Sequence, residues 1–275
     1  MNTEQFENKI KEIENDAIHG AIYLTIELLH ALLKEAERRE DGFPNFLQLL
    51  KQLEKLHPAM TSIENSLSNI AENIGCCEFK RENVLRVVSE EISEVKEREK
   101  NTIENLCSEL ENYQSIMTIS SSSTILNALE KIHSKTRIKS IYILESRPLF
   151  EGRLTANSLA KLGYEVKIIV DAAAAYYSKN IDAIVIGADT VFQDGSVINK
   201  IGSMNLALLA KYYKIPFFVA ASKNKFSKNL PDKLFEYIEE KPEVDIWSEA
   251  PTAVSKLNVF FELVPFNLIT KIISD

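Results

Sequence analysis

Cysteine and long apolar runs are scarce in this sequence of 275 residues. Its three cysteines are too few for a disulfide framework, and they lack the paired Cys-x-x-Cys motifs and neighbouring histidines of a zinc site. No apolar run reaches the roughly 20 residues that cross a bilayer. The first residues, Met1–Glu4, have neither the basic nor the apolar region of a secretory signal. We therefore expect a cytoplasmic protein with reduced thiols, no metal and no membrane contact.

Several catalytic motifs are also missing. The sequence contains no GxGxxG, which argues against a nicotinamide cofactor, and no GxxxxGK[ST], which argues against a P-loop nucleotidase. It contains no HExxH and no GxSxG. The four histidines, His19, His30, His57 and His133, lie in helical or helix-end context, where a packed or solvated role is the usual one. We expect no cofactor.

Charge is unevenly distributed along the chain. Lys and Arg number 32 against 40 Asp and Glu, and the net charge of −8 argues against nucleic acid as a direct partner. Residues 1–113 hold 23 acidic and 13 basic side chains, whereas residues 114–275 hold 17 and 19. This difference predicts two domains, an acidic one over 1–113 and a nearly neutral one over 114–275.

Apolar residues at three- and four-residue spacing predict amphipathic helices in the first domain. The first helical region runs from Phe6 to Leu33, with a break or bend at His19-Gly20. Further helices are predicted over 43–56, 62–74 and 79–112. Cys76 and Cys77 fall on the turn between the last two, and we interpret them as structural.

Short apolar runs alternate with helical segments after residue 113. The predicted strands are Ser115–Ile119, Ser140–Leu144, Val166–Val170, Ala183–Ile186, Phe217–Ala220 and Val259–Leu263. The predicted helices are 123–134, 152–162, 172–179, 203–214, 231–239 and 266–274. This alternation is typical of a parallel sheet covered on both faces. The predicted fold class is α/β, with an N-terminal helical domain followed by a Rossmann-like, doubly wound parallel sheet.

Polar residues follow the strands of this sheet, where open α/β folds bind their ligands. Ser120, Ser121, Ser122 and Ser123 come after the first strand and directly before a helix, where they either help bind a phosphate or simply cap the helix. Arg147 follows the second strand, and it forms either a bidentate contact to a phosphate or carboxylate or a structural salt bridge.

The later strands add a carboxylate, an amide and two lysines. Asp189 follows the fourth strand, and Asn199 and Lys200 come shortly before the next helix. Lys225 follows the fifth strand, where a solvated role is the main alternative to ligand binding. A base, an amide and cations at one sheet edge are the groups that hold a sugar hydroxyl and its phosphate.

Motifs of the second domain, and one short motif of the first, resemble a known family. The runs "ESRPLFEGRLTA", "VIGAD", "NKIG" and "IMTISSSSTIL" are similar to the translation initiation factor 2B alpha/beta/delta family, and "DAIHGA" fits more loosely. That family also contains ribose-1,5-bisphosphate isomerase and methylthioribose-1-phosphate isomerase. The resemblance implies an N-terminal helical domain, a Rossmann-like C-terminal domain and a dimer formed mainly through the latter.

Two departures bear on activity. The isomerase branches carry a cysteine within a Thr-His-Cys motif, and the matching stretch here is Thr118-Ile119-Ser120. They also carry an Arg-Gly-Ala near the N-terminus, where this chain has His19-Gly20-Ala21. The aspartate of the GAD motif is kept as Asp189. An unactivated hydroxyl does not replace a thiol with a pKa near 8.5 in acid–base catalysis. The resemblance implies that the Arg-Gly-Ala binds phosphate in the isomerases. Both departures therefore count against isomerisation.

Three hypotheses follow. The first is a non-catalytic regulatory subunit of the initiation factor 2B type, a homodimer or higher homo-oligomer that binds a sugar phosphate or nucleotide monophosphate and a partner protein such as the initiation factor 2 alpha subunit. The second is an aldose-ketose isomerase of ribose 1,5-bisphosphate that uses Asp189 as its catalytic residue. The third is a stand-alone ligand sensor. The expected ligand-binding residues are Gly20, Ser120, Ser121, Ser122, Ser123, Arg147, Asp189, Asn199, Lys200 and Lys225.

Overall fold

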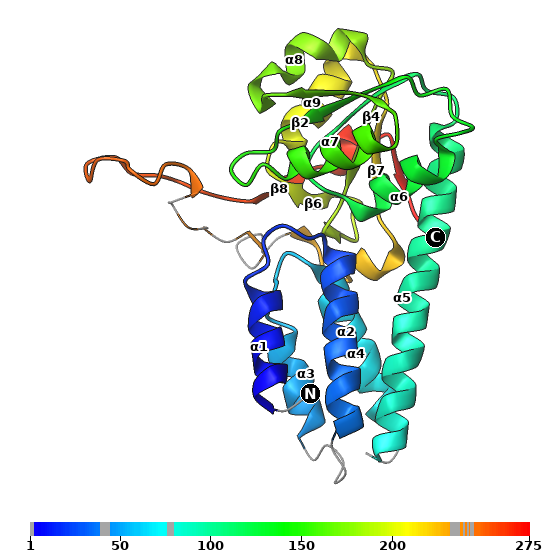
Figure 1. Ribbon diagram of the computed structural model, residues 1–275, viewed down its shortest axis with the longest axis vertical. Helices are drawn as coiled ribbons and strands as arrows, with labels where there is room; N and C mark the ends of the chain where they lie inside the picture. Colours follow the sequence, from blue (N-terminus) through cyan, green and yellow to red (C-terminus); the bar gives the residue numbers. More distant parts are fainter. Residues whose placement is uncertain are drawn as a thin grey trace.

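Helices form the N-terminal part of the molecule, as far as the structure describes it (Figure 1). A computed structural model of the chain describes residues 3–38, 45–75, 80–231, 237–238, 240, 242 and 245–275. The helices are α1 (Thr3–Glu14), α2 (Ala21–Arg38), α3 (Phe46–Leu53), α4 (Thr61–Gly75) and α5 (Arg81–Leu110). The predicted break at His19-Gly20 is confirmed, because it separates α1 from α2. Cys76 and Cys77 lie outside the described residues.

The apolar stripes of these helices form one core. Leu28 and Leu32 of α2 are fully buried with Ile63 and Leu67 of α4 and with Val88 of α5. Burying a side chain of this size stabilises the fold by about 1.5–3 kcal/mol relative to leaving it exposed. None of the described helices is long and apolar enough to cross a membrane.

A six-stranded parallel sheet forms the centre of the C-terminal part. Its strands are β1 (Ser115–Thr118), β2 (Ser140–Leu144), β3 (Glu165–Ile169), β4 (Ala183–Gly187), β7 (Phe217–Ala220) and β9 (Lys271–Ile273). They are ordered β3-β2-β1-β4-β7-β9, and every neighbouring pair is parallel. The first five match the predicted strands within one residue at each end. Four of them are mostly buried apolar runs, whereas β3, at the sheet edge, is only partly buried and contains Glu165 and Lys167.

Helices cover both faces of this sheet, as the predicted doubly wound fold requires. They are α6 (Ser123–Ile132), α7 (Glu151–Lys161), α8 (Ala174–Tyr177) and α9 (Ser203–Tyr213). One face packs against α8 and α9, and the other packs against α6, α7 and the C-terminal end of α5. Leu106 and Leu110 of α5 belong to this second core, while Val84 and Val88 of the same helix belong to the helical one. The domain boundary at residue 113 stays a prediction.

Two predicted elements differ from the structure. The strand predicted over 259–263 was expected to join the parallel sheet, but β8 (Phe261–Val264) pairs antiparallel with β6 (Val197–Lys200), which in turn pairs with β5 (Thr190–Val191) in a second, three-stranded sheet. An apolar run shows that a strand forms without showing which strand it pairs with.

The helix predicted over 266–274 is wrong. This segment forms a short 3-10 turn at Phe266–Leu268 and then the edge strand β9, which pairs with β7. Its isoleucines, among them Ile272 and Ile273, are β-branched and favour a strand beside an open sheet edge. The helix predicted over 231–239 lies for the most part outside the described residues.

Buried hydrogen bonds join the helical part to the sheet part. The hydroxyl groups of Thr61 on α4 and Thr190 on β5 lie 2.7 Å apart, and Thr190 Oγ1 donates to the carbonyl oxygen of Ala59 at 2.9 Å. These contacts place the N-terminal end of α4 against β5 of the second sheet. The N-terminal end of α2 also faces the sheet part of the molecule (Figure 1).

Candidate functional site

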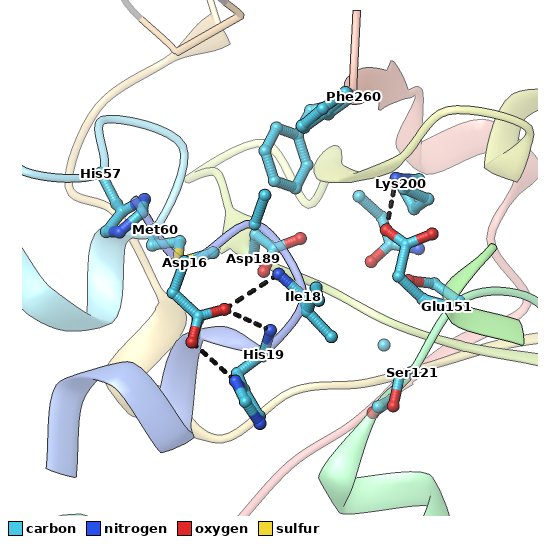
Figure 2. A pocket seen from close by; sticks show the side chains of 18 of the residues that line it. Asp16, Ile18, His19, His57, Met60, Ser121, Glu151, Asp189, Lys200 and Phe260 are labelled. Atoms are coloured by element: carbon cyan, nitrogen blue, oxygen red, sulfur yellow. Dashed lines mark hydrogen bonds and ion pairs between the residues drawn. The ribbon is translucent and has the colours of Figure 1, made fainter. Parts of the chain in front are cut away.

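A cavity of about 400 Å³ lies between the helical part and the sheet. It opens beside the ends of β1 and β4, and the loop between α1 and α2 closes its other side. β1 and β4 are neighbours in the sheet, although β2 and β3 come between them in the chain. The chain connections that follow β1 and β4 therefore lead toward opposite edges of the sheet. At such a switch point a crevice opens outside the carboxyl ends of the strands. Figure 2 shows the side chains that line the cavity.

The serine loop after β1 forms one wall. Ser120 has a left-handed backbone with a φ of 66°, and its N–H donates to Ser146 Oγ at 2.7 Å. Thr155 Oγ1 of α7 donates to the carbonyl oxygen of Ser120 at 2.8 Å. Ser122 is the N-cap of α6, because its Oγ accepts from the N–H of Ile125. The loop is thereby held at a helix N-terminus, whose free N–H groups favour an anion.

Asp189 lies at the end of β4 and faces the cavity (Figure 2). Removal from bulk water raises the pKa of its carboxyl group to about 6, while the positive charges of Lys225 and Lys200 oppose this rise and the carboxylate of Glu151 adds to it. Its own N–H donates to the carbonyl oxygen of Ile198, which fixes the backbone. Asp189 is therefore able to take up or release a proton close to neutral pH.

Lys200 forms a buried ion pair in the same cavity. Its Nζ lies 2.5 Å from Oε1 of Glu151, and side-chain exposure is 5% for the lysine and 3% for the glutamate. Lys200 Nζ also lies 4.7 Å from the centre of the Phe260 ring. Burial raises the pKa of Glu151, an effect that Lys200 opposes. Asn199, next in the chain, donates from Nδ2 to Ser203 Oγ at 2.8 Å.

Lys225 supplies a second buried lysine. It ends the 3-10 turn η3 (Lys223–Lys225) after β7, lines the cavity and is 5% exposed. Within the described part of the chain its Nζ forms no ion pair. Asn65 of α4 holds this turn by donating from Nδ2 to the carbonyl oxygens of Asn224 and Phe226 at 2.8 and 3.0 Å.

The loop between α1 and α2 is organised around Asp16. Its Oδ1 accepts from the N–H groups of Ile18 and His19, each at 2.9 Å, and its Oδ2 lies 2.6 Å from Nδ1 of His19 (Figure 2). Burial pushes the pKa of Asp16 upward, but the hydrogen bonds from His19 and Ile18 outweigh it and hold the pKa below its usual value. Gly20 brings this loop close to the backbone of Ser121.

Comparison with known proteins identifies the family. A family model described as the Initiation factor 2 subunit family matches residues 17–275. The chain belongs to this family.

Relatives within the Initiation factor 2 subunit family carry different names. The chain is 32% identical over 275 residues to a ribose 1,5-bisphosphate isomerase of Archaeoglobus fulgidus, covering 97% of this chain and 86% of that protein. It is 40% identical over 142 residues to a methylthioribose-1-phosphate isomerase of Bacillus thuringiensis, covering 49% of this chain and 40% of that protein. A solved translation initiation factor eIF-2B from Pyrococcus horikoshii superposes with a TM-score of 0.86 at 25% identity, covering 99% and 96% of the two chains.

Most of the residues predicted for the site come together in this member of the Initiation factor 2 subunit family. The cavity is lined by Gly20, Ser120, Ser121, Ser122, Ser123, Asp189, Asn199, Lys200 and Lys225. They come from four separate places, namely the α1–α2 loop, the end of β1, the β4–β6 region and the turn after β7. That these residues contact a ligand stays a prediction.

Arg147 is not among the residues that line the cavity. Its N–H donates to Asp171 Oδ2 at 2.8 Å, and its guanidinium group donates to the carbonyl oxygen of Ile246 at 2.9 Å and lies 4.8 Å from the Phe150 ring. Leu149 and Glu151, which also follow β2, do line the cavity, so the contacts of Arg147 itself and not the position of β2 keep it out of the cavity lining. These contacts are structural, but none that involves the Arg147 side chain is the salt bridge offered above as the alternative, and ligand binding by Arg147 stays a prediction.

Further residues of the cavity, among them Glu151, His19 and His57, were not predicted as site residues from the sequence. Glu151 lines it, and the available signal was an acidic residue four positions after Arg147 at the start of a helix. His19 and His57 also line the cavity, although a packed or solvated role was expected. His57 Nε2 donates to the carbonyl oxygen of Ile13 at 2.6 Å. Among the described residues, no group of three or more His, Cys, Asp or Glu side chains is placed to hold a metal ion.

Proposed function

We propose that this chain is a non-catalytic subunit of the initiation factor 2B type that binds a sugar phosphate or a nucleotide monophosphate in the cavity. The observation that carries this proposal is Ser120, which stands in the cavity where the isomerase branches of the family carry a cysteine. A serine hydroxyl group does not ionise near neutral pH, whereas a thiol with a pKa near 8.5 is partly ionised there. The remaining polar groups of the cavity suit binding.

The groups around the cavity divide into two kinds. Lys225 and the serine loop at the N-terminus of α6 offer a positive charge, hydroxyl groups and N–H groups for a phosphate. Asp189 and Asn199 offer a carboxyl and an amide for sugar hydroxyl groups. A volume of about 400 Å³ falls in the range of small-molecule sites.

A second candidate function is isomerisation of a phosphorylated aldose to a ketose. Asp189 supports it, because its pKa of about 6 suits a group that carries a proton between neighbouring carbon atoms. The name of the Archaeoglobus fulgidus relative is consistent with this activity.

Association with other subunits also stays a proposal. Exposed apolar side chains support it on one face of the sheet, where Tyr176 of α8 is 68% exposed and Tyr212 and Leu208 of α9 are 78% and 47% exposed. Such a surface suits a second copy of the chain or another subunit. The initiation factor 2 alpha subunit remains a predicted partner.

The experiment that tests these proposals combines turnover and binding. Conversion of ribose 1,5-bisphosphate and of methylthioribose 1-phosphate is followed by NMR with the wild-type protein and with Asp189→Asn. Calorimetry measures binding of ribose 5-phosphate and AMP to the wild-type protein. We expect binding without conversion. Conversion that Asp189→Asn abolishes establishes the isomerase instead, and the absence of both binding and conversion contradicts a sugar-phosphate site.

A further inference from the structure

The cavity has two lysines, but one of them is already neutralised. Lys200 Nζ lies 2.5 Å from Glu151 Oε1, and both side chains are almost completely buried. Figure 2 shows this pair at one side of the cavity, with Asp16 and His19 at the other and Asp189 between them in this view. Glu151 is the first residue of α7, where the helix N-terminus favours its negative charge.

Glu151 has spare capacity as an acceptor. Its second oxygen, Oε2, is buried and has no hydrogen-bond partner among the described residues. A phosphate group placed at Lys200 therefore meets a buried carboxylate directly beside the lysine. Two buried negative charges that share one cation are strongly unfavourable, because little water is present to screen them.

The other basic groups of the cavity do not replace Lys200. His19 faces the carboxylate of Asp16 at 2.6 Å, and His57 donates its Nε2 hydrogen to a backbone carbonyl group. Arg147 does not line the cavity. Lys225 remains as the lysine without an ion-pair partner in the described part of the chain.

Acidic side chains in the cavity outnumber Lys225, the lysine that has no ion-pair partner among the described residues. Glu14, Asp16, Asp189 and Asp245 line the same cavity as the ion pair. A phosphate monoester carries about 1.5 to 2 negative charges at neutral pH. One such group is matched by Lys225 with the serine loop, whereas a second one at the opposite end of a sugar meets mostly carboxyl groups.

We propose that Glu151 is a specificity-determining residue that restricts the ligand of this cavity to compounds with one phosphate group. By neutralising Lys200, it removes the positive charge that a second phosphate requires. This inference rests on the proposed function, in which the cavity binds a phosphorylated sugar. It selects sugar monophosphates or nucleoside monophosphates over sugar bisphosphates.

The test compares ligands with one and two phosphates by calorimetry at pH 7.5. The probes are ribose 1-phosphate, ribose 5-phosphate and ribose 1,5-bisphosphate. For the wild-type protein we expect the bisphosphate to bind at least about threefold more weakly than the tighter monophosphate. For Glu151→Gln, which frees Lys200 while keeping the side-chain size, we expect the bisphosphate to bind at least about tenfold more tightly than to the wild-type protein. Binding of the monophosphate should change by less than about threefold.

Two further variants separate this effect from a general change of charge. Glu145→Gln also removes one carboxylate near β2, but Glu145 pairs with Arg153 at 3.2 Å and does not line the cavity, so it should leave all three affinities unchanged. In the double variant Glu151→Gln/Lys200→Met, the gain for the bisphosphate should disappear, because that gain requires the freed lysine. Circular dichroism verifies that each variant is folded.

The outcomes distinguish this inference from the proposed function. A wild-type protein that binds the bisphosphate within about threefold of the tighter monophosphate, or more tightly than it, overturns the restriction to one phosphate but leaves a sugar-phosphate site intact, and this comparison needs no variant. A folded Glu151→Gln protein with unchanged preference overturns the role of Glu151. If none of the three compounds binds to the wild-type protein or to Glu151→Gln, the proposed function itself fails.

Discussion

Arg98 Nη1 of α5 donates a 2.9 Å hydrogen bond to Oδ1 of Asn224, the residue directly before Lys225. Asn65 of α4 donates to the backbone on both sides of that lysine. Two helices of the N-terminal part therefore hold the turn that presents the available lysine to the cavity. The helical part positions one wall of the site in addition to covering it.

Asn65→Ala tests this support. The substitution removes two hydrogen bonds and leaves the carbonyl groups of Asn224 and Phe226 without their donor. We expect the free energy of unfolding to fall by about 1–3 kcal/mol in urea titrations. Binding of ribose 5-phosphate should weaken as well, because Lys225 loses its fixed position.

Asn105→Ala is the matched control for that prediction. Asn105 also donates from Nδ2 to a backbone carbonyl group, that of Ser274, but it does so at the exposed end of α5. We expect a loss below about 0.5 kcal/mol, since water replaces the lost partner. Equal losses for the two variants would contradict a special role of the Asn65 contacts.

Lys225→Met should weaken binding of ribose 5-phosphate by at least about tenfold in calorimetry. The lysine is 5% exposed, and a charge-assisted hydrogen bond to a phosphate is worth about 1.5–3 kcal/mol. Lys223 lies in the same turn, but its side chain is 59% exposed and 3.9 Å from Asp275. Lys223→Met should therefore bind like the wild-type protein, and a similar loss in both variants would point to a general effect of net charge.

Gly152→Ala should severely destabilise the protein. A Cβ atom at this position would lie 1.8 Å from the carbonyl oxygen of Leu144, so α7 would have to move away from β2. We expect a loss of more than about 3 kcal/mol, measured by thermal and urea unfolding. Gly20→Ala is the comparison, because the nearest atom to its Cβ would be 3.7 Å away, and it should change stability by less than about 1 kcal/mol. A stable Gly152→Ala protein contradicts the close packing of α7 on β2.

The raised pKa of Asp189 predicts that the stability of the folded chain depends on pH. Its pKa is raised from 3.8 to about 6 in the folded chain, so the folded state binds this proton more tightly than the unfolded state does. The resulting stabilisation is complete below pH 3.8 and is lost as the pH rises through 6. A rise of this size corresponds to at most about 3 kcal/mol.

Asp189→Asn removes this titration. We expect its stability relative to the wild-type protein to increase by about 1–3 kcal/mol between pH 4 and pH 7, as measured by urea unfolding at each pH. Other carboxyl groups titrate in both proteins and largely cancel in the comparison. A difference that stays constant over this range means that Asp189 titrates near its ordinary pKa.

Local sequence patterns predicted most of the secondary structure for a physical reason. Strands such as Ser140–Leu144 and Phe217–Ala220 are buried on both faces, so continuous apolar runs mark their full lengths. The amphipathic helices α2 and α5 carry apolar residues at the spacing that one buried face requires. Short elements with weaker patterns, such as β5 and β9, were missed or assigned to another class.

The serine loop, Asp189 and Lys225 were predicted as site residues because parallel strands end at a common edge. Arg147 shares that sequence signal, yet its guanidinium group donates to the carbonyl oxygen of Ile246 and the residue does not line the cavity. The pairing of Lys200 with Glu151 involves residues 49 positions apart, and neither local spacing nor composition specifies such a contact.

Residue identity and local periodicity were enough to predict the family, the helical and α/β character of the two halves and the serine at position 120 in place of a thiol. Which polar groups share one cavity, and which of its lysines has no ion-pair partner among the described residues, became known from the folded chain alone. Strand order and helix packing bring distant residues together, and the resulting burial and ion pairing set the charge that a ligand meets.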